Sequence, residues 1–147
     1  MTKQEFQDLT QNIVILDGAT GSNLMAAGMP KGVWTEEWVL AHKDVIQKLQ
    51  RAYVDAGSDI IYAPTFGGNR VNLTMHGLQD RIEEINRTLV SYSREVADAA
   101  AHKVFVAADI TTSGKMMAPA GEMTYDAAFE MYQEQITILK DSGIDLI

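Results

Sequence analysis

A short phrase that occurs twice constrains the fold of this chain more than any other feature. Residues 55–61 read Asp-Ala-Gly-Ser-Asp-Ile-Ile, and residues 141–147 read Asp-Ser-Gly-Ile-Asp-Leu-Ile. In each copy the glycine suits the left-handed turn that ends a helix, and the apolar run that follows suits a buried strand. The second copy contains only the first residues of its predicted strand. The repeat therefore predicts one part of a larger architecture of alternating strands and helices.

Four apolar runs are predicted to be strands, and they begin near Ile13, Asp59, Val104 and Ile144. A short helix is predicted before the first run. Apolar residues at three- and four-residue spacing predict longer helices between the runs. Strands that are apolar on both faces and alternate with helices predict a parallel sheet covered by helices. The expected helices cover residues 2–11, 38–56, 79–102 and 124–142, with a long loop at 19–37.

Two folds fit this pattern, an open doubly wound sheet and part of a (β/α)8 barrel. A polar, glycine-rich segment follows each of the first three strands, at residues 17–23, 64–70 and 109–114. In a barrel every such loop lies on one rim, whereas an open sheet concentrates its ligand loops at one switch point. A complete barrel needs about 250 residues, so 147 residues correspond to roughly half of one. The prediction is an α/β fold in which residues 1–147 form the N-terminal half of a (β/α)8 barrel, with parallel strands and three intervening helices.

Composition excludes several classes of function. The chain has no cysteine, which rules out disulfides, thiolate zinc sites and cysteine nucleophiles within it. The net charge of −8, without a basic run, argues against a nucleic-acid-binding surface. No apolar stretch reaches the ~20 residues of a membrane span, and the polar N-terminus lacks a signal-peptide apolar region, so we expect a cytoplasmic protein. The three histidines lie in separate segments and form no metal-ligand pair.

The ends of the first and third predicted strands carry candidate binding residues. Asp17 ends the first strand, where a rigid strand can orient its carboxylate, and Gly18 lets a ligand approach the backbone. Asp109 holds the equivalent position after the third strand. Each aspartate can equally be a turn residue that accepts its own backbone N–H groups. The hydroxyl-rich segment 111–114 can solvate an anion or be an ordinary loop.

The loop after the second strand offers a second group of candidates. Thr65 and Asn69 can form hydrogen bonds to a ligand, and two glycines between them allow close backbone approach. Phe66 lies in the same loop, where a buried aromatic side chain can also be structural. The sequence is consistent both with a loop that binds a ligand and with a turn that is only structural.

Taken together, these segments resemble the homocysteine S-methyltransferase family, which includes the N-terminal module of cobalamin-dependent methionine synthase and the betaine–homocysteine methyltransferases. The resemblance covers nearly the whole chain, in order and at fitting separations. It rests on Leu16-Asp-Gly-Ala-Thr-Gly21, the segment around Trp34, Tyr53-x-x-Ala-Gly-x-Asp-Ile60, Thr65-Phe-x-x-Asn69 and Gly143-x-Asp145.

The resemblance implies a (β/α)8 barrel that binds homocysteine at its C-terminal rim. Family members activate the homocysteine thiol on a zinc ion held by three cysteines, and the thiolate takes a methyl group from a corrinoid, a sulfonium or a betaine-type donor. No residue here is therefore assigned to catalysis or to metal, and zinc and a corrinoid partner are expected only of the complete family protein. By resemblance, the substrate-binding residues are Asp17, Gly18, Ala19, Thr20, Thr65, Phe66, Asn69 and Asp109.

The expected function is binding of homocysteine for S-methylation to methionine, with these residues alone inactive. The first and fourth strands would be open edges, so we expect self-association, completion by a missing C-terminal half, or poor order at residues 144–147. Two other functions fit the same loops. One is a non-enzymatic α/β module that binds an amino acid or an anion, and the other is a half-barrel interaction subunit completed by another chain.

Overall fold

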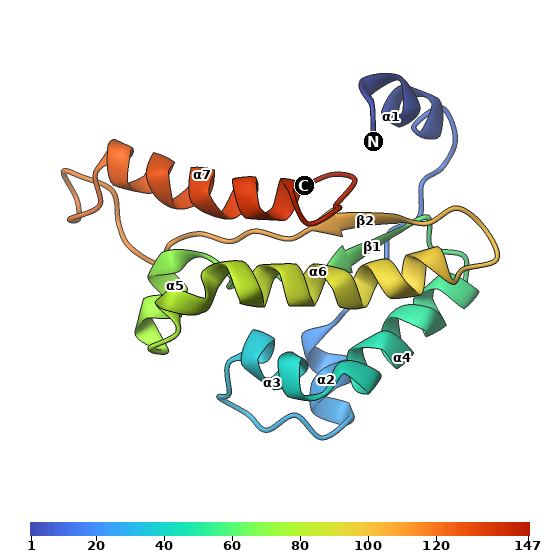
Figure 1. Ribbon diagram of the computed structural model, residues 1–147, viewed down its shortest axis with the longest axis horizontal. Helices are drawn as coiled ribbons and strands as arrows, with labels where there is room; N and C mark the ends of the chain where they lie inside the picture. The colour runs from blue at the N-terminus through green and yellow to red at the C-terminus, as the bar shows by residue number, and fades with distance from the viewer.

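The computed structural model describes residues 1–147 as two parallel strands packed against helices (Figure 1). Four helices precede the first strand, and the segment between the two strands includes the longest helix. In chain order the elements are α1 (Lys3–Leu9), α2 (Gly21–Ala26), α3 (Thr35–Ala41), α4 (Lys43–Asp55), β1 (Ile60–Ala63), α5 (Arg70–Met75), the 3₁₀ helix η1 (Gln79–Arg81), α6 (Ile82–Asp98), β2 (Phe105–Ala108) and α7 (Tyr125–Lys140). None of these helices is long and apolar enough to cross a membrane.

The strands lie side by side in the order of the chain. β1 and β2 pair in parallel, with Ile60 opposite Phe105. Leu16 forms a single parallel bridge to Ile60 on one side of the pair, and Leu146 forms one to Ala107 on the other side. Four parallel segments are therefore arranged in sequence order, as neighbouring strands are in a (β/α)8 barrel.

Only two of the four predicted strands are regular strands. The segments that begin at Ile13 and Ile144 form one bridge each, so the prediction of four strands is not confirmed. Each of these segments has a partner on one side only, which leaves half of its backbone groups without a sheet neighbour. Ile13, in the first of these segments, is 90% exposed.

The helices differ from the predictions mainly at their boundaries. The helix predicted at 38–56 is divided into α3 and α4 at His42, whose φ of −132° and ψ of 50° are not helical. The loop predicted at 19–37 contains α2 and the start of α3, and the helix predicted at 79–102 ends at Asp98. α5 was not predicted; it begins where the side chain of Asn69 accepts the N–H of Asn72 at 2.9 Å.

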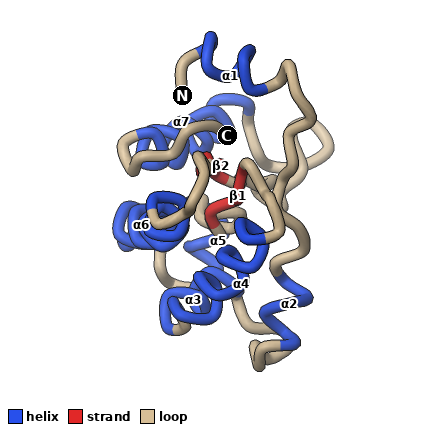
Figure 2. The backbone as a smooth tube through the Cα atoms, turned by 90° about the vertical axis from the view of Figure 1, so that its right-hand side faces the viewer, coloured by secondary structure: helices blue, strands red, loops and turns tan.

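The two faces of the strands are covered differently. Ile61 and Val106 lie on the face that packs against buried apolar residues of α4, α6 and α7. Ile60 and Phe105 point to the opposite face, where the packed residues include Met1 and Leu9 from the N-terminal segment. This alternation is the two-residue period of a strand. Figure 2 shows α6 and α7 together on one side of the strands, and the chain that connects α1 to α2 on the other.

Candidate functional site

A cavity of about 640 Å³ lies at the C-terminal ends of β1 and β2. Its lining comes from segments that are far apart in the chain, because parallel strands bring the loops that follow them to one edge of the sheet. The loop after β1 contributes Phe66 and the loop after β2 contributes Asp109, while Thr20, Trp34 and His76 come from the N-terminal and α5 regions. The predicted convergence of the three loop segments is thus present in the structure.

Asp17 supports the cavity from the first of these segments without lining it. Its Oδ2 accepts the N–H of Tyr62 at 3.0 Å, which attaches the segment after Leu16 to the end of β1. Burial, and to a smaller extent the nearby charge of Asp109, raises the pKa of Asp17 to about 6 against the lowering effect of the Tyr62 hydrogen bond. The carboxyl of Asp17 therefore gains or loses its proton in mildly acidic solution.

Thr65 joins the two loops that follow β1 and β2. Its side chain is fully buried and makes no part of the cavity lining. The Thr65 hydroxyl donates to the carbonyl of Asp109 at 2.8 Å and accepts the Asp109 N–H at 3.1 Å. The half-buried carboxyl of Asp109 lines the cavity, and its burial raises its pKa above the ordinary value.

Glu36 and Trp34 line the cavity from the start of α3, and sequence reasoning did not include them among the site residues. The carboxylate of Glu36 is 4% exposed and accepts the N–H of Gly67, and burial raises its pKa. Trp34 stacks on His76 with ring centroids 4.8 Å apart. A Cβ at Gly67 would lie 2.8 Å from both Glu36 Oε1 and Trp34 Nε1, so the glycine pair after Phe66 was the signal that something packs closely there.

The remaining predicted residues hold the loops in place. A Cβ at Gly18 would lie 2.9 Å from the hydroxyl of Tyr53. The carbonyl of Ala19 accepts hydrogen bonds from that hydroxyl at 3.0 Å and from Asn23 Nδ2 at 2.6 Å. Asn69 is fully buried and caps α5.

The eight predicted residues therefore fall into two groups. Those that line the cavity are Thr20, Phe66 and Asp109; those that support it from behind are Asp17, Gly18, Ala19, Thr65 and Asn69. The role of all eight in substrate binding stays a prediction.

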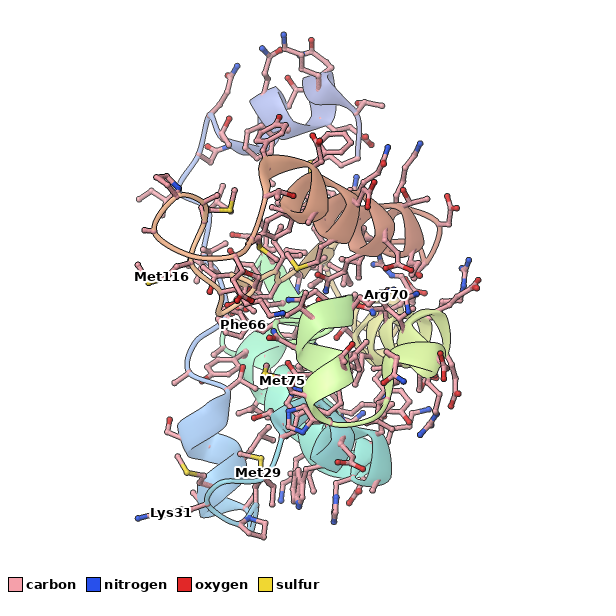
Figure 3. The ribbon with its side chains drawn as sticks, turned by 90° about the vertical axis from the view of Figure 1, so that its left-hand side faces the viewer. Met29, Lys31, Phe66, Arg70, Met75 and Met116 are labelled. Atoms are coloured by element: carbon pink, nitrogen blue, oxygen red, sulfur yellow. The ribbon has the colours of Figure 1, made fainter.

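The charges around the cavity are acidic. Glu36 and Asp109 line it together with His76, and no lysine or arginine does. The mouth is apolar: Phe66 is 53% exposed and Met75 is 68% exposed, and Figure 3 shows both side chains on the same side of the molecule. Such a site suits a ligand with an ammonium group and an apolar part better than an inorganic anion.

The residues present do not fit a zinc site of the thiolate kind. No three side chains among histidine, cysteine, aspartate and glutamate are placed together to hold a metal ion, and the chain has no cysteine. No chemical step is therefore derived through zinc from these residues.

Comparison with known proteins identifies the family. The family model of the homocysteine S-methyltransferases matches residues 14–147. The chain belongs to the homocysteine S-methyltransferase family. The methionine synthase of Mycobacterium tuberculosis (strain ATCC 25618 / H37Rv) is 28% identical over 148 residues, which cover 95% of this chain and 12% of that protein. S-methylmethionine–homocysteine S-methyltransferase BHMT2 of Pongo abelii is 31% identical over 86 residues, 58% of this chain and 22% of that one.

Solved structures of homocysteine methyltransferases share the fold. The metallated form of the homocysteine methyltransferase MmuM from Escherichia coli matches with a TM-score of 0.78 and 18% identity, over 95% of this chain and 55% of that chain. The oxidized form matches with a TM-score of 0.74, over 94% of this chain and 53% of that chain. The family resemblance seen in the sequence is confirmed. The chain spans about half the length of these homocysteine methyltransferase structures.

Proposed function

We propose that residues 1–147 form the N-terminal half of a (β/α)8 barrel and supply half of a homocysteine-binding site at its rim. The observation that carries this proposal is the single cavity at the ends of β1 and β2, to which Thr20, Phe66 and Asp109 come from three successive strand–loop units. Membership of the homocysteine S-methyltransferase family and the sequential order of four parallel segments support the same conclusion.

The chemistry of the cavity suggests what these residues do to a bound homocysteine. The carboxylates of Glu36 and Asp109 attract its ammonium group, and the apolar surface of Phe66 and Trp34 accommodates its methylene chain. Binding in one orientation fixes the position of the thiol. These residues contribute to methyl transfer by holding the substrate in that orientation.

Thiol activation requires groups that these residues do not contain. We propose that the zinc ligands expected for the family are contributed from outside residues 1–147, and that the isolated chain binds homocysteine without methylating it. A corrinoid-bearing partner is proposed as the methyl donor, on the basis of the methionine synthase relatives.

Calorimetry distinguishes this function from that of an anion-binding module. The chain is titrated separately with L-homocysteine and with inorganic phosphate at pH 7. Heat of binding is expected with homocysteine and not with phosphate, because carboxylates and no lysine or arginine line the cavity. Binding of phosphate without binding of homocysteine would contradict the proposal.

The variant Asp109→Asn tests whether the binding occurs in this cavity. It removes one cavity charge and keeps the backbone hydrogen bonds of Asp109 to Thr65. Homocysteine affinity is expected to fall about tenfold. Asp55→Asn makes the same change in net charge at an exposed residue outside the cavity, and it is expected to leave the affinity unchanged.

A further inference from the structure

Two buried amide side chains lie directly beneath the loop that follows β1. Gln135 of α7 and Asn86 of α6 are both fully buried, and neither lines the cavity. Gln135 Nε2 donates to the carbonyl of Thr65 at 3.0 Å and to Asn86 Oδ1 at 3.3 Å. Asn86 Nδ2 in turn donates to the carbonyl of Gly68 at 2.8 Å. Both ends of the loop segment 65–68 are thus held by side chains from the helices behind the sheet.

The opposite side of this loop faces the cavity. The N–H of Gly67 is held by the buried carboxylate of Glu36. The Thr65 hydroxyl makes its two shorter hydrogen bonds to the backbone of Asp109 and a longer one, of 3.4 Å, to the carbonyl of Ala63. There is no free space on the side of α6 and α7, since a Cβ at Gly68 would lie 2.5 Å from Asn86 Oδ1. The loop is therefore fixed between buried amides on one side and the Glu36 carboxylate and the Asp109 backbone on the other.

We propose that Gln135 and Thr65 are positioning residues of the homocysteine site: Gln135 fixes the backbone of the loop after β1, and Thr65 transmits that position to Asp109. The inference rests on the proposed homocysteine-binding function for its ligand, and on the hydrogen bonds alone for its structural part. Gln135 Oε1 has no partner, but the amide N–H groups of both side chains are bonded. Buried polar contacts of this kind favour one loop geometry, because another arrangement would leave the carbonyls of Thr65 and Gly68 without these partners.

The structural part is tested by amide hydrogen exchange, which needs no ligand. Thr65→Val keeps the shape of the side chain and removes the partner of the Asp109 N–H, so exchange at Asp109 is expected to become about tenfold faster. Thr65→Ser restores a hydroxyl and is expected to return the rate towards that of the wild type. Unchanged exchange at Asp109 in Thr65→Val would overturn the proposal.

The effect on the site is tested with a matched pair of glutamine variants. Gln135→Met removes one hydrogen bond to a backbone carbonyl and one to a side chain. Gln47→Met removes an equivalent pair, to the carbonyl of Tyr92 at 3.0 Å and to Glu95 at 2.8 Å, at a place that does not line the cavity. Gln135→Met is expected to weaken homocysteine binding about fivefold or more, and Gln47→Met is expected to leave it unchanged. Both variants are expected to lose a similar amount of folding stability.

The two measurements separate the possible failures. If the wild type does not bind homocysteine, the proposed function fails, while the exchange rates at Asp109 still decide whether the loops are coupled. If both glutamine variants weaken binding equally, the loss follows general stability, and the positioning role of Gln135 is overturned.

Discussion

Asp59 and Asp145 make the same hydrogen bond in the two copies of the repeated phrase. Asp59 Oδ2 accepts the N–H of Ile15 at 2.9 Å, and Asp145 Oδ2 accepts the N–H of Val106 at 2.9 Å. In both cases a carboxylate at the start of one strand segment binds the backbone of the segment that precedes it in the sheet. The sequence repeat therefore corresponds to a repeated way of attaching one parallel segment to the next.

Removal of these carboxylates is expected to destabilise the sheet. Asp59→Ala should lower the free energy of unfolding by on the order of 1 kcal/mol, since the N–H of Ile15 loses its partner. Asp145→Ala should cost more, because Asp145 also pairs with Arg94 at 2.8 Å. Urea unfolding followed by circular dichroism measures both. Asp55→Ala, at an exposed residue at the end of α4, should stay within about 0.5 kcal/mol of the wild type.

Stability should depend on pH through Asp17. Its pKa is raised from 3.8 to about 6 in the folded chain, so between these values the folded state binds more protons than the unfolded state. The free energy of unfolding is therefore expected to fall as the pH rises through this window. Asp17→Asn keeps an oxygen that can accept the Tyr62 N–H and carries no charge, so it should flatten the pH dependence. Asp55→Asn serves as the control, and identical profiles for Asp17→Asn and wild type would contradict the assignment.

Gly68 should not tolerate a side chain. Its Cβ would lie 2.5 Å from Asn86 Oδ1 and 3.0 Å from the carbonyl of Thr65, so Gly68→Ala is expected to cost about 1–3 kcal/mol in urea unfolding. Gly21→Ala is the matched control: nothing lies within 4 Å of its Cβ, and Gly21 is the first residue of α2. That substitution should be neutral or stabilise the chain by up to about 1 kcal/mol.

Ligand binding should be visible in the fluorescence of Trp34. The chain has two tryptophans, and Trp38 stacks on His42 outside the cavity lining. In the variant Trp38→Phe, addition of homocysteine should change the emission of the remaining Trp34. The variant Trp34→Phe should show no change on the same titration. A full response from Trp34→Phe would place the binding elsewhere.

The open edge of the sheet should promote association. Ile15 is 50% exposed next to the single bridge of Leu16, so its segment can pair with another chain. Size-exclusion chromatography with light scattering should show larger species as concentration rises, and fewer of them for Ile15→Lys. Phe6→Lys adds the same charge at a similarly exposed residue of α1 and should not have this effect. A wild type that stays monomeric at every concentration would contradict the expectation.

The sequence was sufficient to predict the alternation of strands and helices, since apolar runs and glycine turns are local signals. It could not show that the runs at Ile13 and Ile144 stop at single bridges, because strand length depends on neighbours in space. Asp109 and Phe66 were found from their positions at strand ends. Glu36 and Gln135 were not, since a buried polar residue has the same sequence context as an exposed one until its tertiary partners are known.

The sequential order of the four parallel segments has a consequence for how the chain is made. Within residues 1–147, each of these segments pairs with the segment directly before or after it in the chain, so none of these pairings has to wait for a distant segment. The residues that line the cavity have all been synthesised once the loop after β2 has emerged, and Gln135, which holds the loop after β1, follows in α7. The sheet of such a chain is therefore expected to assemble progressively during translation, one strand–helix unit after another.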